Sequence, residues 1–116
     1  PALKISGAVA ANGGGGGGGG GPADGDPGRP GGDGRLDLQP APGGGPSVLG
    51  CGRPGGDGAA ETALDGKPGI AFVLTQTCRQ VAGGGGGGGS SGFIFVASPA
   101  FTAAPTSKIS PPAAMQ

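Results

Sequence analysis

The hydrophobic positions of this chain fall into three short runs, and the first lies at its beginning. Residues 1–12 alternate apolar with small or polar side chains through Leu3, Ile5 and Val9, with a break at Gly7. Alternation with a period of two is typical of a strand that buries one face. The pattern therefore predicts a half-buried strand here.

Two further runs follow in the second half of the chain. Residues 70–81 are rich in β-branched and aromatic side chains, which predicts a second strand. In residues 92–101, two phenylalanines alternate with Ile94 and Val96, so both sides of the run are apolar. A strand of this kind is expected to be buried on both faces.

Glycine tracts separate these runs. Residues 13–21 are nine consecutive glycines, and residues 83–89 are seven more. Residues 22–69 form a variable insert rich in glycine, proline and aspartate, and residues 102–116 form a tail rich in alanine, proline and threonine. Within that tail, residues 107–110 predict one more short strand.

The composition leaves little material for a side-chain core. The chain has 33 Gly and 13 Pro among 116 residues, with no Trp and no Tyr. Glycine and proline together make about 40%, which is beyond the level typical of low-complexity chains. The one candidate helix, over residues 59–65, would have two turns at most. The predicted fold is a single domain over residues 1–116, mostly irregular and β, with almost no helix.

We interpret the glycine tracts as an ordered scaffold. Glycine can adopt the polyproline II helix, which has three residues per turn and leaves every backbone N–H and C=O free to bond neighbouring helices. The core is then a bundle of polyglycine and polyproline II helices held by backbone hydrogen bonds. The alternative is a pair of flexible linkers. The glycines that represent the predicted scaffold are Gly13, Gly17, Gly21, Gly83, Gly86 and Gly89.

Two internal repeats are visible. The heptapeptide GRPGGDG occurs at residues 28–34 and again at 52–58. The tripeptide KIS occurs at residues 4–6 and 108–110, and PAL at the beginning of the chain resembles PAF at 99–101. Ends that resemble each other are typical of one unit of an array, either a covalent repeat or a head-to-tail polymer.

The two cysteines, Cys51 and Cys78, predict one disulfide. A bridge between them would constrain the unfolded chain by roughly 3–4 kcal/mol, which matters in a domain with so little apolar mass. The alternative is two free thiols in a reducing compartment. A chain that begins with Pro1 also suits a processed product, so we expect a secreted, extracellular or cell-surface protein.

Charge and residue types exclude several function classes. Seven basic residues balance seven acidic ones, so no charge points to nucleic acid, and no apolar stretch is long enough to span a membrane. Histidine is absent, which removes the commonest general base and metal ligand. We expect no enzyme activity and no cofactor. Four aspartates leave open either a calcium site or simple turn capping: Asp24, Asp26, Asp33 and Asp37.

The pattern of residues 5–21 and 83–96 resembles the glycine-rich repeats of large secreted bacterial surface proteins. In those repeats a strand ending in Ala-Asn-Gly opens into poly-glycine, and a second glycine tract leads into another strand. The chain is more weakly similar to bacteriophage tail-fibre tip adhesins, which use polyglycine helices. Both resemblances imply an extracellular structural or adhesive role without catalytic residues.

The leading hypothesis is a structural subunit of an extracellular bacterial filament, appendage or surface layer, whose partner is another copy of itself. The residues predicted to make this head-to-tail assembly are Leu3, Ile5, Val9, Phe93, Ile94, Phe95, Val96, Phe101 and Ile109. The alternative is an adhesin module that recognises a cell-surface ligand through residues 22–69. A remote third hypothesis is an ice-binding protein.

Overall fold

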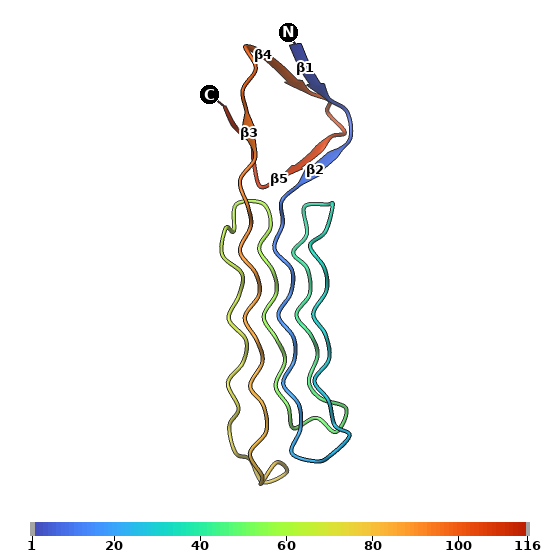
Figure 1. Ribbon diagram of the computed structural model, residues 1–116, viewed down its shortest axis with the longest axis vertical. Coiled ribbons are helices and arrows are strands. Elements are labelled where there is room, and N and C mark those ends of the chain that lie inside the picture. The colour runs from blue at the N-terminus through green and yellow to red at the C-terminus, as the bar shows by residue number, and fades with distance from the viewer. Residues whose placement is uncertain (1, 116) are drawn as a thin grey trace.

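The computed structural model describes residues 2–115 and shows an elongated molecule of 63 × 20 × 18 Å. A small β cap at one end carries both described ends of the chain, and a bundle of long extended segments hangs below it (Figure 1). None of the described residues forms a helix, and so none forms a helix that could cross a membrane. The predicted non-helical fold with a few short strands is confirmed. The strands are β1 (Ala2–Ile5), β2 (Ala8–Ala10), β3 (Phe95–Val96), β4 (Ala100–Ala103), β5 (Lys108–Ser110) and β6 (Ala114–Met115).

The cap consists of three two-stranded parallel sheets, β1–β4, β2–β5 and β3–β6. In Figure 1 the three sheets form the sides of a triangle seen face on. Strands β1, β2 and β3 therefore make one triangular turn of backbone, which we call the first rung. Strands β4, β5 and β6 make a second rung stacked on it in the same order and direction, as in a short solenoid.

This stacking explains one of the two sequence echoes. Ala2 and Leu3 pair directly with Ala100 and Phe101, so the PAL and PAF segments are neighbouring rungs. Pro1 lies outside the described residues. The KIS echo has no such meaning, because Lys108 pairs with Ala8 rather than with a residue of the first KIS segment.

The bundle is inserted between β2 and β3, and it contains six extended segments that we call rods. Consecutive rods run in opposite directions along the long axis of the molecule (Figure 1). Backbone hydrogen bonds between rods recur at every third residue: Gly13, Gly16 and Gly19 donate to Ala59, Gly56 and Arg53. The rods span residues 13–21 (rod 1), 26–34 (rod 2), 41–47 (rod 3), 52–59 (rod 4), 66–72 (rod 5) and 83–92 (rod 6).

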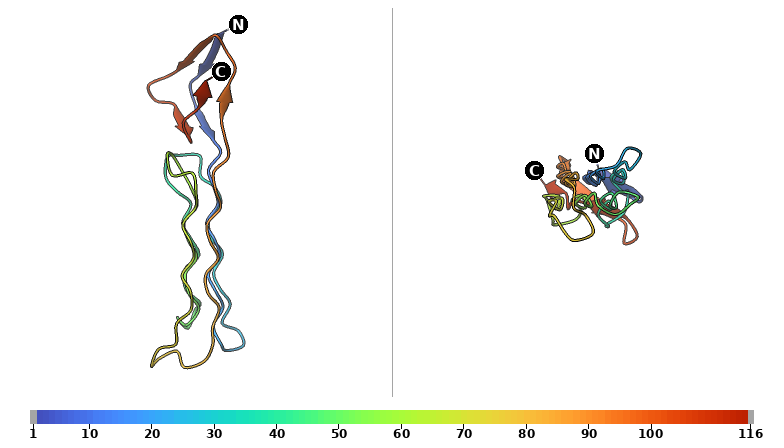
Figure 2. Two further views of the ribbon diagram at one scale, coloured as in Figure 1. Left: turned by 90° about the vertical axis from the view of Figure 1, so that its left-hand side faces the viewer. Right: turned by 90° about the horizontal axis from the view of Figure 1, so that it is seen from below.

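The rods lie in two layers (Figure 2). Rods 2, 1 and 6 form the first layer, because rod 1 donates to rod 2 and rod 6 donates to rod 1. Rods 3, 4 and 5 form the second layer through equivalent bonds, and rods 1 and 4 lie at the centre. The first layer continues directly into the first rung, and the second layer lies beneath the second rung (Figure 2).

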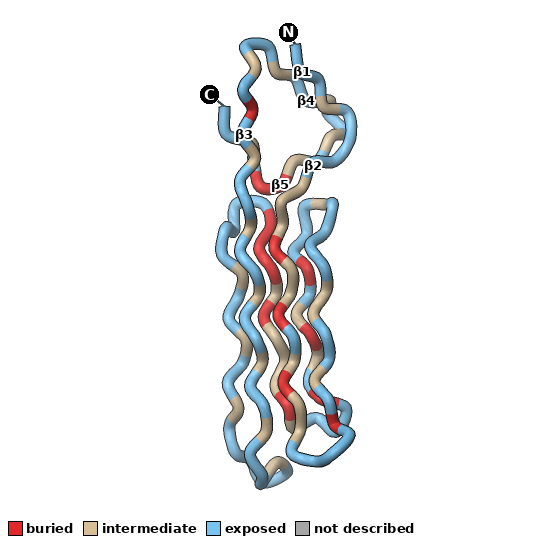
Figure 3. The backbone as a smooth tube through the Cα atoms, viewed as in Figure 1, coloured by how far each residue is buried: buried red, intermediate tan, exposed pale blue. Residues whose placement is uncertain are grey.

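The interior of the bundle is backbone rather than side chain. Among the described residues, the buried apolar side chains are Ala41, Ala59, Ala60, Val96 and Pro111. The buried positions run down rods 1, 3 and 4 at intervals and are mostly glycine (Figure 3). Backbone hydrogen bonds between rods therefore take the place of an apolar core.

The strand predicted over residues 70–81 is absent from the structure. Residues 66–72 form rod 5, in which Lys67 and Ile70 bond rod 4 with a period of three rather than two. Residues 73–81 form a loop at the far tip of the bundle, since rods 5 and 6 run in opposite directions and the chain must turn between them. The β-branched residues of this run are consequently exposed.

Other sequence-based boundaries also change. Residues 22–69, predicted as a variable insert, supply rods 2, 3, 4 and most of rod 5. Residues 59–65 form a turn with a single Ala60–Ala63 bridge instead of a helix. Residues 92–101 contain β3 and the start of β4, and only one side of β3 is buried. Residues 102–115 form no tail, since they complete the second rung.

Candidate assembly site

The free edges of the two rungs carry unpaired backbone groups. In a parallel sheet, successive residues of a strand point their N–H and C=O groups to opposite neighbours. The Ala104 amide donates to Ile5 O at 2.8 Å, so the amide of Ala103 points away from β1. Likewise Lys108 N–H donates to Gly7 O at 3.1 Å, so the amide of Ala8 points away from β5. Each rung thus presents an open edge.

The apolar residues inside the triangle are only half covered. Leu3 lies beside Phe101 and Val9 beside Ile109, on the side of these two sheets opposite to Lys4 and Lys108. In the third sheet Val96 lies beside Met115, on the side opposite to the exposed Phe95. Val96 is 3% exposed, whereas Leu3 is 42% and Met115 54% exposed. Two rungs are too few to close the interior from both ends.

The structure does not bring all nine predicted assembly residues together. Five of them line the rungs, Ile5 ends β1 opposite Ala103, and Ile94 is half-buried just before β3, where its carbonyl oxygen accepts from the Ala114 amide at 2.8 Å. Phe93 and Phe95 instead lie on the outer surface of the cap, 74% and 64% exposed, with ring centroids 6.0 Å apart. The expectation that the run around them is buried on both faces is wrong, because no element covers its outer side. The residues that line the rungs are Leu3, Val9, Val96, Phe101 and Ile109.

The neck between cap and bundle is fixed by Asn12 and Ser110, two residues that the sequence did not single out. Asn12 Nδ2 donates to the carbonyl oxygens of Arg35 and Asp37, both at 2.8 Å. Ser110 is buried; its hydroxyl donates to Asn12 Oδ1 at 2.6 Å and accepts from the Glu61 amide at 2.8 Å. Four distant segments therefore meet at one point, and cap and bundle are held as one body.

Removing the Asn12 side chain is expected to weaken this joint. Asn12→Ala leaves two backbone carbonyls and one buried hydroxyl without their partner, which should cost about 1–3 kcal/mol of unfolding free energy. Gln39→Ala is the matched control, because only the backbone amide of Gln39 bonds in this loop. Thermal denaturation of both variants measures the difference, and equal midpoints would contradict a structural role for the neck.

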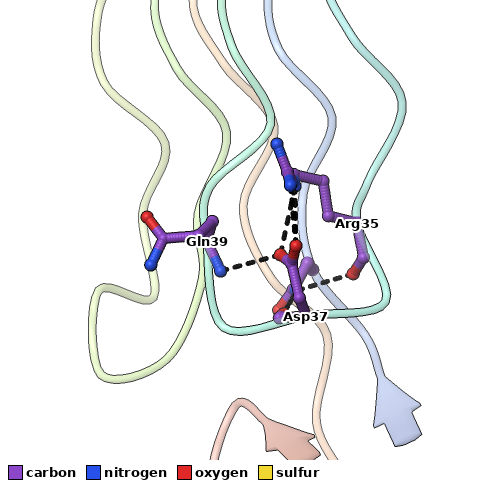
Figure 4. Close-up of polar contacts among 4 residues, drawn as sticks. Arg35, Asp37 and Gln39 are labelled. Carbon is purple, nitrogen blue, oxygen red and sulfur yellow. Dashed lines mark hydrogen bonds and ion pairs between the residues drawn. The ribbon is translucent and has the colours of Figure 1, made fainter.

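Two carboxylates at this end of the bundle have pKa values below their usual range. The Arg35 side chain holds the pKa of Asp37 down, with ion-pair atoms 2.7 Å apart, and the Gln39 amide adds to it (Figure 4). The Gly43 amide lowers the pKa of Asp57 most, followed by Lys67 at 2.9 Å. Both groups face solvent, so these interactions orient the loops rather than stabilise the fold strongly.

The lowered pKa values predict a mild acid sensitivity. A carboxyl group whose pKa falls on folding stabilises the protein above its unfolded pKa of about 3.9, and this contribution is lost as the pH falls through the folded value. The thermal midpoint should therefore drop in acid below about pH 4. The double variant Asp37→Asn, Asp57→Asn should show a flatter profile, and an unchanged slope would contradict these assignments.

The predicted scaffold glycines occupy two kinds of position. A Cβ on Gly13 would collide with the backbone of Gly89 in rod 6, so close approach requires glycine there, whereas a Cβ on Gly21 would meet the side chain of Asp26. A Cβ on Gly17 would lie 3.8 Å from the nearest atom, the Arg29 carbonyl oxygen. Gly86 and Gly89 have similar space, at 3.5 and 3.4 Å, and Gly83 is tighter, at 3.0 Å from the Gly20 nitrogen.

The predicted disulfide between Cys51 and Cys78 is confirmed, with Cα atoms 5.6 Å apart. It ties the loop of residues 73–81 to the start of rod 4 at the tip farthest from the cap. Thr75 and Thr77 lie in this loop, bonded to each other at 3.2 Å, and not on a strand. They form no flat array of the kind that an ice-binding surface needs.

The aspartates considered for calcium do not gather. Asp26 lies at the far end of rod 2 and accepts from the Leu49 amide at 2.9 Å, whereas Asp37 lies at the neck. Across residues 2–115, no cluster of three or more acidic, cysteine or histidine side chains is placed to hold a metal ion. Comparison with known proteins finds no matching family model, no similar curated protein and no similar solved structure.

Proposed function

We propose that this chain is a structural subunit of an extracellular bacterial filament, appendage or surface layer that assembles head-to-tail with copies of itself. The observation that supports this most directly is the two-rung cap, with an open edge on both sides and a half-covered apolar interior. Solenoid rungs are stable when stacked, because each rung covers the apolar side of the next. A contact between different surfaces that does not close on itself produces a filament.

The rods suit this role as an ordered scaffold. We interpret them as polyproline II helices, of the polyglycine type in residues 13–21 and 83–89. The support is the period of three in the hydrogen bonds between rods 1, 2, 4 and 6, which equals the three residues per turn of that helix. An extracellular location is consistent with the disulfide, since such bridges persist in oxidising compartments.

The far tip supports a second candidate, a module that binds a cell-surface ligand. Exposed apolar clusters often mark contact sites on soluble proteins. The ligand would be bound by the tip loops at residues 22–25, 48–50 and 73–81, and not by residues 22–69 as a whole. The exposed aliphatic side chains of this region are Val48, Leu49, Val73, Leu74 and Val81.

Electron microscopy of the purified protein over a concentration series separates the two candidates. A structural subunit forms long uniform filaments above a threshold concentration. Discrete particles of one size at every concentration would contradict the filament and favour the binding module. A second sample, treated with dithiothreitol, shows whether the Cys51–Cys78 disulfide contributes to the integrity of the filaments.

A further inference from the structure

The two open edges of the cap are complementary to each other. The first and second rungs run in the same direction, in the same order, and already pair along all three sides. The outward amide of Ala103 on the second rung and the outward amide of Ala8 on the first are the groups that a continued parallel ladder uses. The second rung of one copy can therefore pair with the first rung of another as it pairs with its own.

Such a contact also covers the apolar interior. Leu3 and Val9 on the first rung are 42% and 37% exposed, and Met115 on the second rung is 54% exposed. These side chains project from the sheets perpendicular to the stacking axis, and a further rung would place its own apolar side chains directly beside them. An apolar patch alone could contact many partners, but this one is bordered on three sides by unpaired backbone groups. Only another rung would cover the apolar side chains and also pair these backbone groups.

The cap and the bundle are each two chain layers thick. Strands in a sheet lie about 4.8 Å apart because a backbone hydrogen bond sets the spacing. The rods are joined by the same N–H to O=C bonds, at 2.7 to 3.1 Å. Rod 1 bonds both rod 3 and rod 4, so the two rod layers are staggered and lie slightly less than one strand spacing apart. Two rungs, about 9.6 Å deep, are therefore accompanied by two rod layers of nearly the same depth. A copy docked on the first rung thus brings its second layer against the first layer of its neighbour.

The outer face of the first layer is suited to this contact. Rods 1 and 6 lie side by side there, and we call their outward residues the glycine face: Gly14, Gly17, Gly20, Gly84 and Gly87. Their amides donate no hydrogen bond within the described residues. A Cβ on any of them would find 3.4 Å or more of space, so the monomer does not require glycine at these places. Glycine costs about 0.5–1 kcal/mol relative to alanine in an ordered element.

We propose that a second copy of this chain docks with its second rung on the first rung and with its second rod layer on the glycine face, forming one continuous interface. This rests on the head-to-tail assembly proposed above and names its surfaces. The tip loops are compatible with it. The loop of residues 22–25 swings out beyond the first layer at one flank, and the loop of residues 73–81 beyond the second layer at the other flank (Figures 1 and 2). Loops of adjacent copies pass beside each other.

The test uses two proline variants that each block one edge. Ala8→Pro removes the outward amide of the first rung, and Ala103→Pro that of the second, and proline is tolerated where the lost amide faces solvent. Each variant alone should need a roughly hundredfold higher concentration to assemble. Mixed in equal amounts, they should form dimers of twice the 10.5 kDa chain mass by sedimentation velocity, because each keeps the edge that the other lacks.

Ala8→Ser and Ala103→Ser are the controls, since they keep the amide and should assemble like the wild type. If the wild type assembles and both proline variants still assemble as well, this interface is wrong, although the proposed filament stands. The same holds if the wild type assembles but the mixture of the two proline variants stays monomeric. A wild-type protein that never assembles would overturn both. Circular dichroism shows whether each variant is folded. If a proline variant does not fold, hydrogen exchange of the Ala8 amide in wild-type assemblies tests the interface instead, because the proposed contact should protect this amide.

The glycine face is tested separately with Gly17→Gln against Thr106→Gln, a change in an exposed turn at a corner of the cap. The first should raise the concentration needed for assembly at least about tenfold, because a bulky side chain holds the layers apart. The second should leave it unchanged. Equal assembly by both variants would remove the glycine face from the interface while leaving the rung contact.

Discussion

Replacing Gly16 with alanine should unfold the bundle or nearly so, whereas the same change at the adjacent Gly17 should be harmless. A Cβ on Gly16 would collide with the carbonyl oxygens of Gly86 and Gly87 in rod 6. Backbone cannot move aside as a flexible side chain can, so rods 1 and 6 would have to separate. Moving rod 6 away breaks the hydrogen bond that the Gly86 amide donates to Gly17 O at 2.8 Å. It also strains the bond that Gly86 O accepts from the Gly56 amide at 2.9 Å. We expect a loss of roughly 3 kcal/mol or more.

Gly17→Ala is the matched control for this prediction. Its Cβ would point outward with 3.8 Å of space, and its φ does not lie in the left-handed region. Replacing glycine in such a position reduces the freedom of the unfolded chain and should change stability by no more than about +1 kcal/mol. Urea denaturation on dilute, unassembled protein compares the two. Equal effects would show that the rods do not pack as closely as described.

Loss of the disulfide should have the second-largest effect. Cys51 and Cys78 are 27 residues apart, and closing a loop of that length restricts the unfolded chain by roughly 3–4 kcal/mol. The loop of residues 73–81 has few other attachments: the Thr75, Cys78 and Arg79 bonds are local, and Arg53 makes one long bond to the Val73 carbonyl oxygen at 3.5 Å. The double variant Cys51→Ser, Cys78→Ser should therefore melt on the order of 10 °C lower.

Limited trypsin digestion gives a local readout of the same change. Arg79 lies in the tethered loop, and cleavage there should become fast in the serine variant or after reduction. Arg35, exposed in the neck loop and followed by Leu36, serves as the internal control, because its carbonyl bonds Asn12 and the disulfide lies at the opposite end of the bundle. A variant with unchanged melting and unchanged cleavage at Arg79 would contradict a structural role for the bridge.

The two poly-glycine rods, 1 and 6, could be anticipated from the sequence, but rods 2 to 5 could not. Both poly-glycine rods appear as uninterrupted tracts, residues 13–21 and 83–89. The other rods carry glycine mainly where they face a neighbour. In rod 2, Gly28 and Gly31 would collide with rod 1 if they carried a Cβ, while Arg29 between them is exposed. Such a segment reads as a proline- and glycine-rich loop.

The sequence indicates the apolar residues of the candidate assembly site but not how they come together. The apolar residues of the cap, such as Leu3 and Phe101, stand out by composition. Their pairing does not, because β1 and β4 are joined across residues as distant as Ala2 and Ala100. Local patterns carry no information about which distant strands meet when an entire bundle is inserted between them. Ser110 and Asn12 were missed for the same reason, since each is unremarkable in its own segment and acts only through the other.

A core made of peptide groups also changes how stability depends on temperature. Unfolding an ordinary domain exposes mostly apolar surface, which raises the heat capacity by about 12–15 cal/mol/K per residue and curves the stability profile. Exposure of polar groups lowers the heat capacity, and this chain buries only a few small apolar side chains among its described residues. Its heat-capacity increment should consequently be small and its stability profile broad and flat. Cooling, which weakens hydrophobic cores, would leave this fold almost unaffected.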